Sequence, residues 1–328
     1  MFMRHRIRAA AVALALLVAV PACSTTPESA SGGAPKGGKV DKILFDFPFT
    51  ALPIYAAVTR SVQQAADAAG VKVVFTNDNM DLGAQVTNLT TYLHSDVDAV
   101  VSFPADPASI DSLAKQYMDA GKIWITYGGD LPHQSASLQF SFLESGRMLG
   151  RGAGEWASRT LGGQGKAVIL SESTTQIGKE RTQGLLEGLR AAAPNLEIVA
   201  QQQAITPQQG LTVTSAVLAQ HPDVNIVLAV PGDAAQGGYQ ALLSAGRSPK
   251  DGRTYVGALD GNLYLFQEMQ KGNAVRAIVT AKTSEVGRAA IEIPLAIGRG
   301  QTPQTDLPVY LVTADSRDLS DYIKDFNG

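Results

Sequence analysis

The stretch Val97–Tyr127, VDAVVSFPADPASIDSLAKQYMDAGKIWITY, decides the fold of this chain. Its first part, VDAVVSF, is an apolar run that predicts a buried strand followed by Pro104. Apolar side chains then recur at the spacing of a helix: Ile110, Leu113, Ala114, Tyr117 and Met118. Gly121 ends that helix, and Ile123–Tyr127 predicts the next strand. Strand, helix and strand in this order form a βαβ unit, the building block of a parallel sheet.

The same alternation of strands and helices continues on both sides of this unit. Before it, residues 42–45 and 71–75 predict strands, and residues 53–69 and 82–94 predict helices. After a break near 138–142 the alternation restarts, and strands are predicted at 167–170, 196–200, 224–230, 255–259, 275–280 and 309–312. Helices are predicted between them at 177–193, 211–220, 234–245, 263–269 and 284–297. Two such runs predict an α/β protein made of two doubly wound, Rossmann-like lobes.

Ligands of doubly wound sheets bind outside the carboxyl ends of the strands, and this rule selects the residues to inspect. Several aromatic side chains fall near predicted strand ends: Phe47, Phe49, Phe103, Tyr127 and Phe142. Carboxylates at further strand ends are Asp46, Asp130 and Asp233, and we interpret each of them as a cap or turn residue. Asp260 also ends a strand, and it can serve either as an acceptor for a ligand or as a helix N-cap.

The sequence lacks the signatures of the enzymes that use such sheets. It contains no G-x-S-x-G, and no G-x-G-x-x-G follows the first strand. The segment GGQGKA at 162–167 precedes a strand, whereas a phosphate-binding loop follows one, so we interpret it as a turn. The four histidines are scattered without ligand spacing. We therefore expect a binding protein with no catalysis, cofactor or metal; a secreted hydrolase, the alternative, would need a nucleophile or metal in its cleft.

Composition restricts the partners. The chain has 328 residues, a net charge of −3 and 17% charged residues, and no basic stripe of the kind that nucleic-acid binding requires. It has one cysteine, so it folds without an internal disulfide and needs a large core of its own. We expect a monomer that does not bind nucleic acid.

The N-terminal segment has the layout of an export signal. Three arginines precede an uncharged run from Ala9 to Ala22, which is too short to span a bilayer, and Val20-Pro21-Ala22-Cys23 follows the pattern of a cleavage site. A cysteine at the cut resembles the lipobox of bacterial lipoproteins, whose thiol is acylated. We therefore predict a signal peptide at 1–22, lipidation of Cys23 and a Ser-, Pro- and Gly-rich tether at 23–40. The alternative is an ordinary secretory signal that contains a cysteine.

The body of the chain, from about Asp41 to Val312, resembles the ribose-binding type of sugar ABC-transporter binding proteins. The resemblance rests on motifs in a shared order: Pro53-Ile54-Tyr55, Gly70, Val100–Pro104, Lys179-Glu180-Arg181, His221–Val224 and Gly257–Gly261. It implies the type I periplasmic binding protein fold, with two lobes joined by a three-crossing hinge near Phe140–Phe142, Ala281 and Val309. The implied lobes are 41–141 with 282–308 and 142–281 with 309–328. Related repressors carry a DNA-binding head where this chain has the signal and tether.

The resemblance implies an extracytoplasmic solute-binding lipoprotein of an ABC importer. A neutral monosaccharide or polyol would be captured between the lobes and delivered to permease subunits served by an ATPase. The protein would be attached to the outer face of the cell membrane by its lipid alone. The alternative is a ligand sensor for a chemoreceptor or a sensor kinase, which the sequence does not exclude.

The implied sugar site contains charged and aromatic side chains. Arg181 matches the family's ligand-binding arginine and Asp260 its hydroxyl acceptor, while Tyr55 replaces a phenylalanine that packs on the sugar. Four departures remove polar contacts to ribose: Leu52, Phe103, Gly128-Gly129 and Ala281. They predict a different neutral ligand, with Lys282 and Asp130 as candidates for compensating contacts. The full predicted set is Arg181, Asp260, Tyr55, Phe47, Phe103, Tyr127, Phe142, Asp130 and Lys282.

Overall fold

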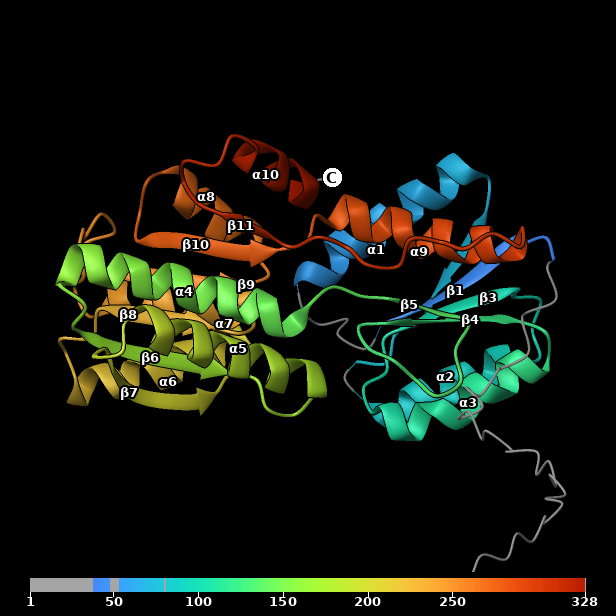
Figure 1. Cartoon of the computed structure of the whole chain (residues 1–328), viewed down its shortest axis with the longest axis horizontal. Coiled ribbons are helices and arrows are strands. Elements are labelled where there is room, and N and C mark those ends of the chain that lie inside the picture. The colour runs from blue at the N-terminus through green and yellow to red at the C-terminus, as the bar shows by residue number, and fades with distance from the viewer. Residues whose placement is uncertain (1–37, 48–52, 80, 328) are drawn as a thin grey trace, which may run out of the picture. The chain divides into compact units, whose positions relative to one another are not determined.

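A computed structural model describes residues 38–47, 53–79 and 81–327. The predicted signal peptide, Cys23, Phe49, Leu52 and nearly all of the predicted tether lie outside these described residues. Within them the chain forms two separate sheets, each covered by helices on both faces (Figure 1). We call the five-stranded sheet with its helices the first lobe and the six-stranded sheet with its helices the second lobe.

The sheet of the first lobe is entirely parallel, with the strand order β2-β1-β3-β4-β5. Its strands are β1 (Lys42–Asp46), β2 (Lys72–Phe75), β3 (Ala99–Ser102), β4 (Ile123–Tyr127) and β5 (Ala136–Leu138). The helices that pack on it are α1 (Pro53–Ala69), α2 (Leu82–Leu93), α3 (Pro107–Asp119) and α9 (Thr283–Gly298). Figure 1 shows α1 and α9 above the strands and α2 and α3 below them.

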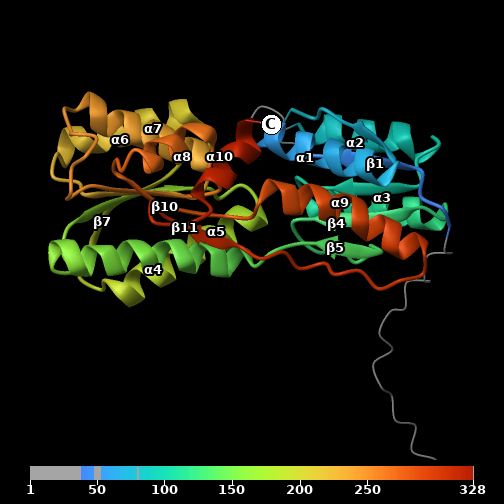
Figure 2. The same cartoon turned by 90° about the horizontal axis from the view of Figure 1, so that it is seen from above.

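The sheet of the second lobe has the order β11-β10-β9-β8-β6-β7, and only β11 runs antiparallel. Its strands are β6 (Lys166–Ser171), β7 (Glu197–Gln203), β8 (Ile226–Ala229), β9 (Tyr255–Leu259), β10 (Val275–Thr280) and β11 (Tyr310–Val312). Its helices are α4 (Phe142–Leu161), α5 (Gln176–Ala192), α6 (Pro207–Gln220), α7 (Gly232–Ser244), α8 (Leu263–Gln270) and α10 (Leu319–Asn327). Figure 2 shows α4 and α5 on one side of this sheet and α6, α7 and α8 on the other.

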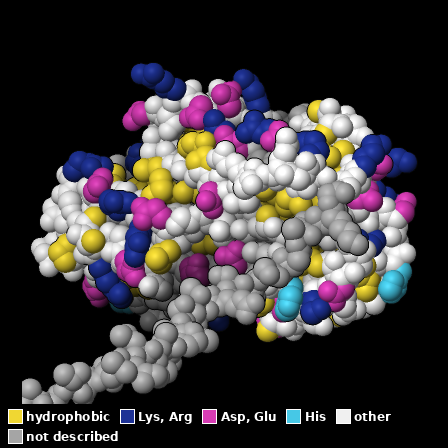
Figure 3. All heavy atoms as spheres, turned by 45° about the vertical axis from the view of Figure 1, so that its right-hand side comes forward, with side chains coloured by type: hydrophobic (Ala, Val, Ile, Leu, Met, Phe, Trp, Pro, Cys, Tyr) yellow, Lys and Arg dark blue, Asp and Glu magenta, His cyan; other side chains and the backbone are white. Residues whose placement is uncertain are grey.

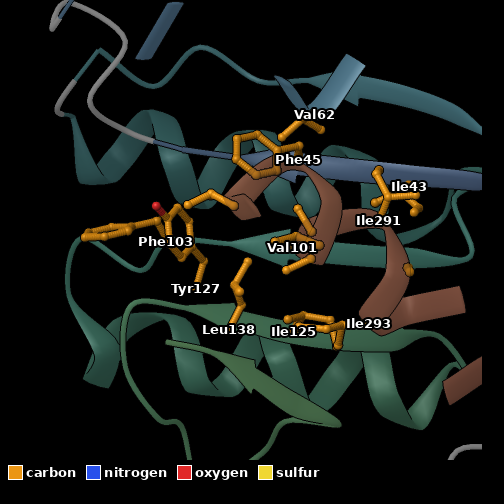
Figure 4. Close-up of a cluster of buried hydrophobic side chains, with 14 of the residues drawn as sticks. Ile43, Phe45, Val62, Val101, Phe103, Ile125, Tyr127, Leu138, Ile291 and Ile293 are labelled. Atoms are coloured by element: carbon orange, nitrogen blue, oxygen red, sulfur yellow. The ribbon is translucent and has the colours of Figure 1, made fainter. Parts of the chain in front are cut away.

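Each sheet is buried on both faces, which explains why its strands read as continuous apolar runs. In the first lobe, strand residues such as Ile43 and Ile125 pack against Ile291 and Ile293 of α9, as Figure 4 shows. Phe103 and Tyr127 lie at one end of this same cluster. The core of the first lobe therefore continues into the residues at the carboxyl ends of its strands.

Three segments carry the chain between the two sheets: 139–141 between β5 and α4, 281–282 between β10 and α9, and 299–309 between α9 and β11. The first and third run side by side, since the Gln139 N–H donates to the Thr305 carbonyl at 3.1 Å and the Leu307 N–H donates to the Gln139 carbonyl at 2.8 Å. The predicted fold class is confirmed. The exact division of the chain between the lobes stays a prediction.

The sequence reading missed three elements: β5, α4 and α10. The largest omission, α4, contains Gly146, Gly150, Gly152 and Gly154, and glycine is among the poorest helix formers. The break expected near 138–142 is instead the end of β5, one hinge segment and the start of this helix, which Ser141 caps by accepting from the Glu144 N–H.

Candidate functional site

A cavity of about 140 Å³ lies where the carboxyl ends of the strands of both lobes converge. On the order of 150 Å³ is enough for one six-membered ring. The cavity is lined from both lobes and from the hinge segments: Phe47, Ile54, Val58, Phe103, Tyr127, Phe140, Phe142, Glu172, Thr174, Thr175, Ile177, Gly178, Arg181, Ile205, Val230, Pro231, Asp260, Thr280, Ala281, Thr283 and Val286. Seven parallel strands end at this cavity, as the rule for doubly wound sheets predicts.

Aromatic rings form the wall contributed by the first lobe. Phe47, Phe103 and Tyr127 follow or end β1, β3 and β4, and their ring centroids lie 5.2 to 5.8 Å apart. Each ring is more than nine-tenths buried, and burial raises the pKa of Tyr127 above its ordinary value. Flat apolar surfaces of this kind pack well on the faces of sugar rings.

The second lobe contributes an ion pair in which the arginine is buried and the aspartate is partly exposed. Nη1 of Arg181, on α5, donates to Oδ2 of Asp260 at 2.5 Å, and Nη2 donates to Oδ1 at 3.3 Å. The Arg181 guanidinium also lies 5.4 Å from the ring centroid of Phe140 and 5.2 Å from that of Phe142. Its Nε is buried and has no hydrogen-bond partner among the described residues. The guanidinium is thus held in one plane at the wall of the cavity.

Asp260 occupies an unusual backbone conformation for its type. Its φ is +54°, in the left-handed region that non-glycine residues rarely adopt, although aspartate tolerates it better than most. The helix after β9 is capped instead by Asn262, whose Oδ1 accepts from the Leu265 N–H. Of the two roles left open for Asp260, the N-cap role is therefore excluded.

Glu172, which follows β6, was not predicted. Its carboxylate accepts from the backbone N–H groups of Thr174 and Thr175 at 2.6 and 3.0 Å, and from both of their hydroxyls. A side chain at Gly178 would overlap Glu172 Oε2, so glycine is required there. Glu172 thereby fixes the turn that leads into α5, the helix that carries Arg181.

Six of the nine predicted ligand-binding residues line the cavity: Arg181, Asp260, Phe47, Phe103, Tyr127 and Phe142. The remaining three lie elsewhere for identifiable reasons. Tyr55 stacks on Phe47, at 5.6 Å between ring centroids, and its hydroxyl donates to the Thr76 carbonyl at 3.1 Å. Its neighbour Ile54 lines the cavity instead.

Asp130 and Lys282 also lie outside the cavity wall. Asp130 is exposed, and its carboxylate accepts from Gln134 Nε2 at 2.9 Å, which agrees with a turn role. Lys282 pairs with Asp318 at 3.1 Å and lies 5.4 Å from the ring centroids of Tyr310 and Tyr322. These partners hold the ammonium group away from the ligand space.

Asp46 is neither a cap nor a turn residue, contrary to expectation. It ends β1 fully buried, and it accepts hydrogen bonds from Thr76, Gln85 and Ser102 at 2.7, 2.8 and 2.6 Å. Burial and a hydrogen bond with Asp78 raise the pKa of Asp46 to about 7. The position of Asp46 at the end of a strand marked it as a residue to inspect. The sequence did not show that this carboxylate is buried.

Three further cavity residues that the sequence analysis did not identify lie at the carboxyl ends of strands. Glu172, Val230 and Thr280 stand at the carboxyl ends of β6, β8 and β10. Val58 and Val286 carried no signal, because a valine on a helix reads as core.

Within residues 38–47, 53–79 and 81–327, no helix is long and apolar enough to cross a membrane, and no group of three or more His, Cys, Asp or Glu side chains is arranged to hold a metal ion. On the face seen in Figure 3, basic and acidic side chains are interspersed over both lobes. Mixed charge of this kind contrasts with the one-sided basic surface of a nucleic-acid binder.

The chain belongs to the periplasmic binding protein family, because the family's periplasmic binding protein domain matches residues 43–302. The predicted resemblance is confirmed. Proteins of this family bind solutes for transport and work outside the cytoplasm, and both statements extend to this chain.

Individual relatives are distant. The ABC transporter periplasmic-binding protein YphF of Escherichia coli is 24% identical over 80% of this chain and 84% of that protein. The D-ribose/D-allose-binding protein of Pseudomonas aeruginosa is 28% identical over 72% of this chain and 76% of that protein. A solved ABC transporter periplasmic solute binding protein from Actinobacillus succinogenes, with bound D-allose, has a TM-score of 0.76 at 18% identity and covers 86% of this chain and 99% of that chain. This last likeness concerns the fold.

Proposed function

We propose that this chain is the solute-binding subunit of an ABC importer and that it captures a neutral monosaccharide or polyol between its two lobes. In this proposal residues 41–141 with 282–308 and residues 142–281 with 309–328 close on the ligand as a monomer. The closed form docks on the permease, whose ATPase drives uptake. Ligand binding shifts the population toward the closed form because the ligand contacts both lobes only there.

The observation that carries this proposal is the pairing of Arg181 with Asp260 at the wall of a ring-sized aromatic cavity. A guanidinium and a carboxylate can donate to and accept from adjacent hydroxyls. The rings of Phe47, Phe103 and Tyr127 supply surfaces for the apolar faces of a sugar. The names of the relatives, which include D-ribose and D-allose, are compatible with this ligand class.

Calorimetric titration with a panel of sugars and polyols tests the ligand class. Arg181→Lys keeps the positive charge beside Asp260 but loses the planar fork, so we expect at least about tenfold weaker binding of whichever ligand is found. Arg190→Lys is the matched control, since Arg190 is exposed near the end of the same helix and does not line the cavity. No binding of any panel member to the wild-type protein would overturn the sugar assignment.

We further propose that the mature protein is held at the outer face of the cell membrane by a lipid on Cys23. The support is the order of the basic residues, the apolar run and the small residues before Cys23. Cys23→Ser removes the acylated thiol, so the protein should move from the membrane fraction to the soluble fraction. Retention of the Cys23→Ser protein in membranes would overturn the anchor and leave the binding function untouched.

A further inference from the structure

The two lobes contribute chemically different halves to the cavity. All three charged side chains in the described lining, Glu172, Arg181 and Asp260, belong to the second lobe. They follow β6, lie on α5 and follow β9 respectively. The groups able to exchange paired hydrogen bonds with a ligand are therefore concentrated on one side.

The half contributed by the first lobe is almost entirely apolar. Its described lining residues are Phe47, Ile54, Val58, Phe103, Tyr127, Thr283 and Val286. Their side chains include two hydroxyls, those of Tyr127 and Thr283, and the Thr283 hydroxyl already donates to Asp325 at 3.3 Å.

A sugar with hydroxyls on every edge does not match this asymmetry. Hydroxyls facing Arg181 and Asp260 find partners. A hydroxyl turned toward Ile54, Val58 and Phe103 would be buried without a partner among these side chains of the described lining, which is unfavourable. A methyl group in the same place would instead gain from burial. The discrimination between a methyl group and a hydroxyl in an apolar pocket is typically about 10- to 100-fold.

The ligand is nonetheless polar on its other side. The guanidinium of Arg181 and the carboxylates of Glu172 and Asp260 line this side of the cavity, and the Asp260 side chain is 32% exposed. An apolar ligand would cover these groups without replacing their hydration, whereas ligand hydroxyls can form hydrogen bonds with them. The ligand that fits both halves therefore has a hydroxylated edge and an apolar edge.

We propose that the ligand is a 6-deoxyhexose, held with its ring hydroxyls toward Arg181 and Asp260 and its C5 methyl group against Ile54, Val58 and Phe103. This inference rests on the proposed function, because it specifies which sugars the same cavity takes. In this inference the apolar wall of the first lobe favours sugars without a hydroxyl on C6. The charged residues of the second lobe bind the ring hydroxyls.

Calorimetry with matched pairs tests the inference directly. The pairs differ only at C6: D-fucose with D-galactose, L-fucose with L-galactose, L-rhamnose with L-mannose, and 6-deoxy-D-glucose with D-glucose. In any pair that binds, the deoxy member should bind at least about tenfold more tightly. Equal or tighter binding of the hydroxylated members would overturn the inference but leave the proposed function intact. Failure of every sugar and polyol to bind would overturn the proposed function itself, and with it the inference.

A pair of variants locates the methyl group. Ile54→Asn introduces a hydrogen-bonding group of similar size on the apolar wall, so the preference for the deoxy sugar should fall several-fold relative to the wild type. Ile54→Leu keeps the wall apolar and should keep the preference. Because the readout is a ratio of two affinities within one protein, a general loss of stability does not imitate it. An unchanged ratio in Ile54→Asn would contradict the placement of the methyl group.

Discussion

Arg181 is held in one orientation by other side chains of the protein, which would favour the ligand-binding role proposed for it. The rings of Phe140 and Phe142 lie close to the guanidinium, and Asp260 fixes its orientation through two hydrogen bonds. A side chain already held in its binding geometry loses little conformational entropy on binding. Lysine lacks the planar guanidinium group that the aromatic rings and Asp260 orient, but it keeps the positive charge. The Arg181→Lys variant therefore tests the geometry of the side chain while its charge is unchanged.

Asp46 makes stability depend on pH. Because its pKa is raised from 3.8 to about 7, the folded protein keeps a proton that the unfolded chain releases. The free energy of unfolding should therefore fall as pH rises from about 4 to about 7, by roughly 1 kcal/mol per pH unit, and then level off. Denaturant unfolding at a series of pH values measures this slope.

Asp46→Asn cannot ionise, so the slope between pH 4 and 7 should become shallower in this variant. Asp130→Asn is the control, because Asp130 is exposed and should leave the slope as it is in the wild type. A wild-type stability that rises over this interval, or an Asp46→Asn profile parallel to that of the wild type, would show that Asp46 is not the group responsible.

At the residue scale, the sequence identified those cavity-lining residues that are charged or aromatic and also lie near the end of a strand or the start of a helix. Arg181 and Asp260 carry charge near the start of a helix and at the end of a strand, and the aromatic residues Phe47, Phe103 and Tyr127 follow or end strands. The prediction for Tyr55 was wrong by one position, because its neighbour Ile54 lines the cavity. The angle at which a helix packs decides which of two adjacent residues faces a cavity, and the sequence does not show this angle. Glu172 directly follows β6, so the same position at a strand end would have identified it.

At the scale of elements, α4 and α5 pack with their backbones in close contact. A Cβ at Gly146 would fall on the Arg181 carbonyl oxygen, and one at Gly150 on the Leu185 carbonyl oxygen. A Cβ at Gly184 would in turn fall on the Leu143 carbonyl oxygen of α4. The two backbones therefore touch, and α4 supports the turn of α5 that presents Arg181.

Two glycines on α4 provide a matched test of this contact. Gly150→Ala places a methyl group against the backbone of α5 and should lower the free energy of unfolding by about 1–3 kcal/mol. At Gly152 the nearest atom to an added Cβ is Tyr255 Oη at 3.6 Å, an ordinary contact, so Gly152→Ala should be neutral or stabilising by up to about 1 kcal/mol. Chemical denaturation compares them, and equal effects would contradict a tight α4–α5 contact.

The same glycines explain where sequence reasoning failed at this scale. Strands such as β4 and β9, and the helix α1, were predicted with their observed ends, because their apolar periodicity is strong and breakers flank them. In α4 the residues that allow close packing are those that weaken a helix signal. In α10, which was also missed, only a few residues, among them Leu319 and Tyr322, are buried.

At the scale of the whole molecule, the cavity is built jointly by the two lobes. Ile54 and Val286 lie in the first turns of α1 and α9 in the first lobe, whereas Ile177 and Gly178 lie in the first turn of α5 in the second. A ligand that fills the cavity should therefore stabilise both lobes together by mass action.

Hydrogen exchange followed by mass spectrometry measures this coupling. With a saturating sugar, protection of backbone amides should increase in the first turns of α1, α9 and α5 alike. The Arg181→Lys protein at the same sugar concentration serves as the control and should show a smaller increase. Protection confined to α5 would mean that the ligand contacts only the second lobe.

Phe140 and Ala281 line the cavity and also lie in two of the segments that cross between the lobes. In the proposed function, a ligand in this cavity would contact the crossing segments themselves, so its binding would change the angle between the two lobes. A membrane partner could then recognise that angle on the outer surface of the protein without touching the sugar. The same closed shape would report any ligand that fits the cavity, so the partner would need no sugar specificity of its own.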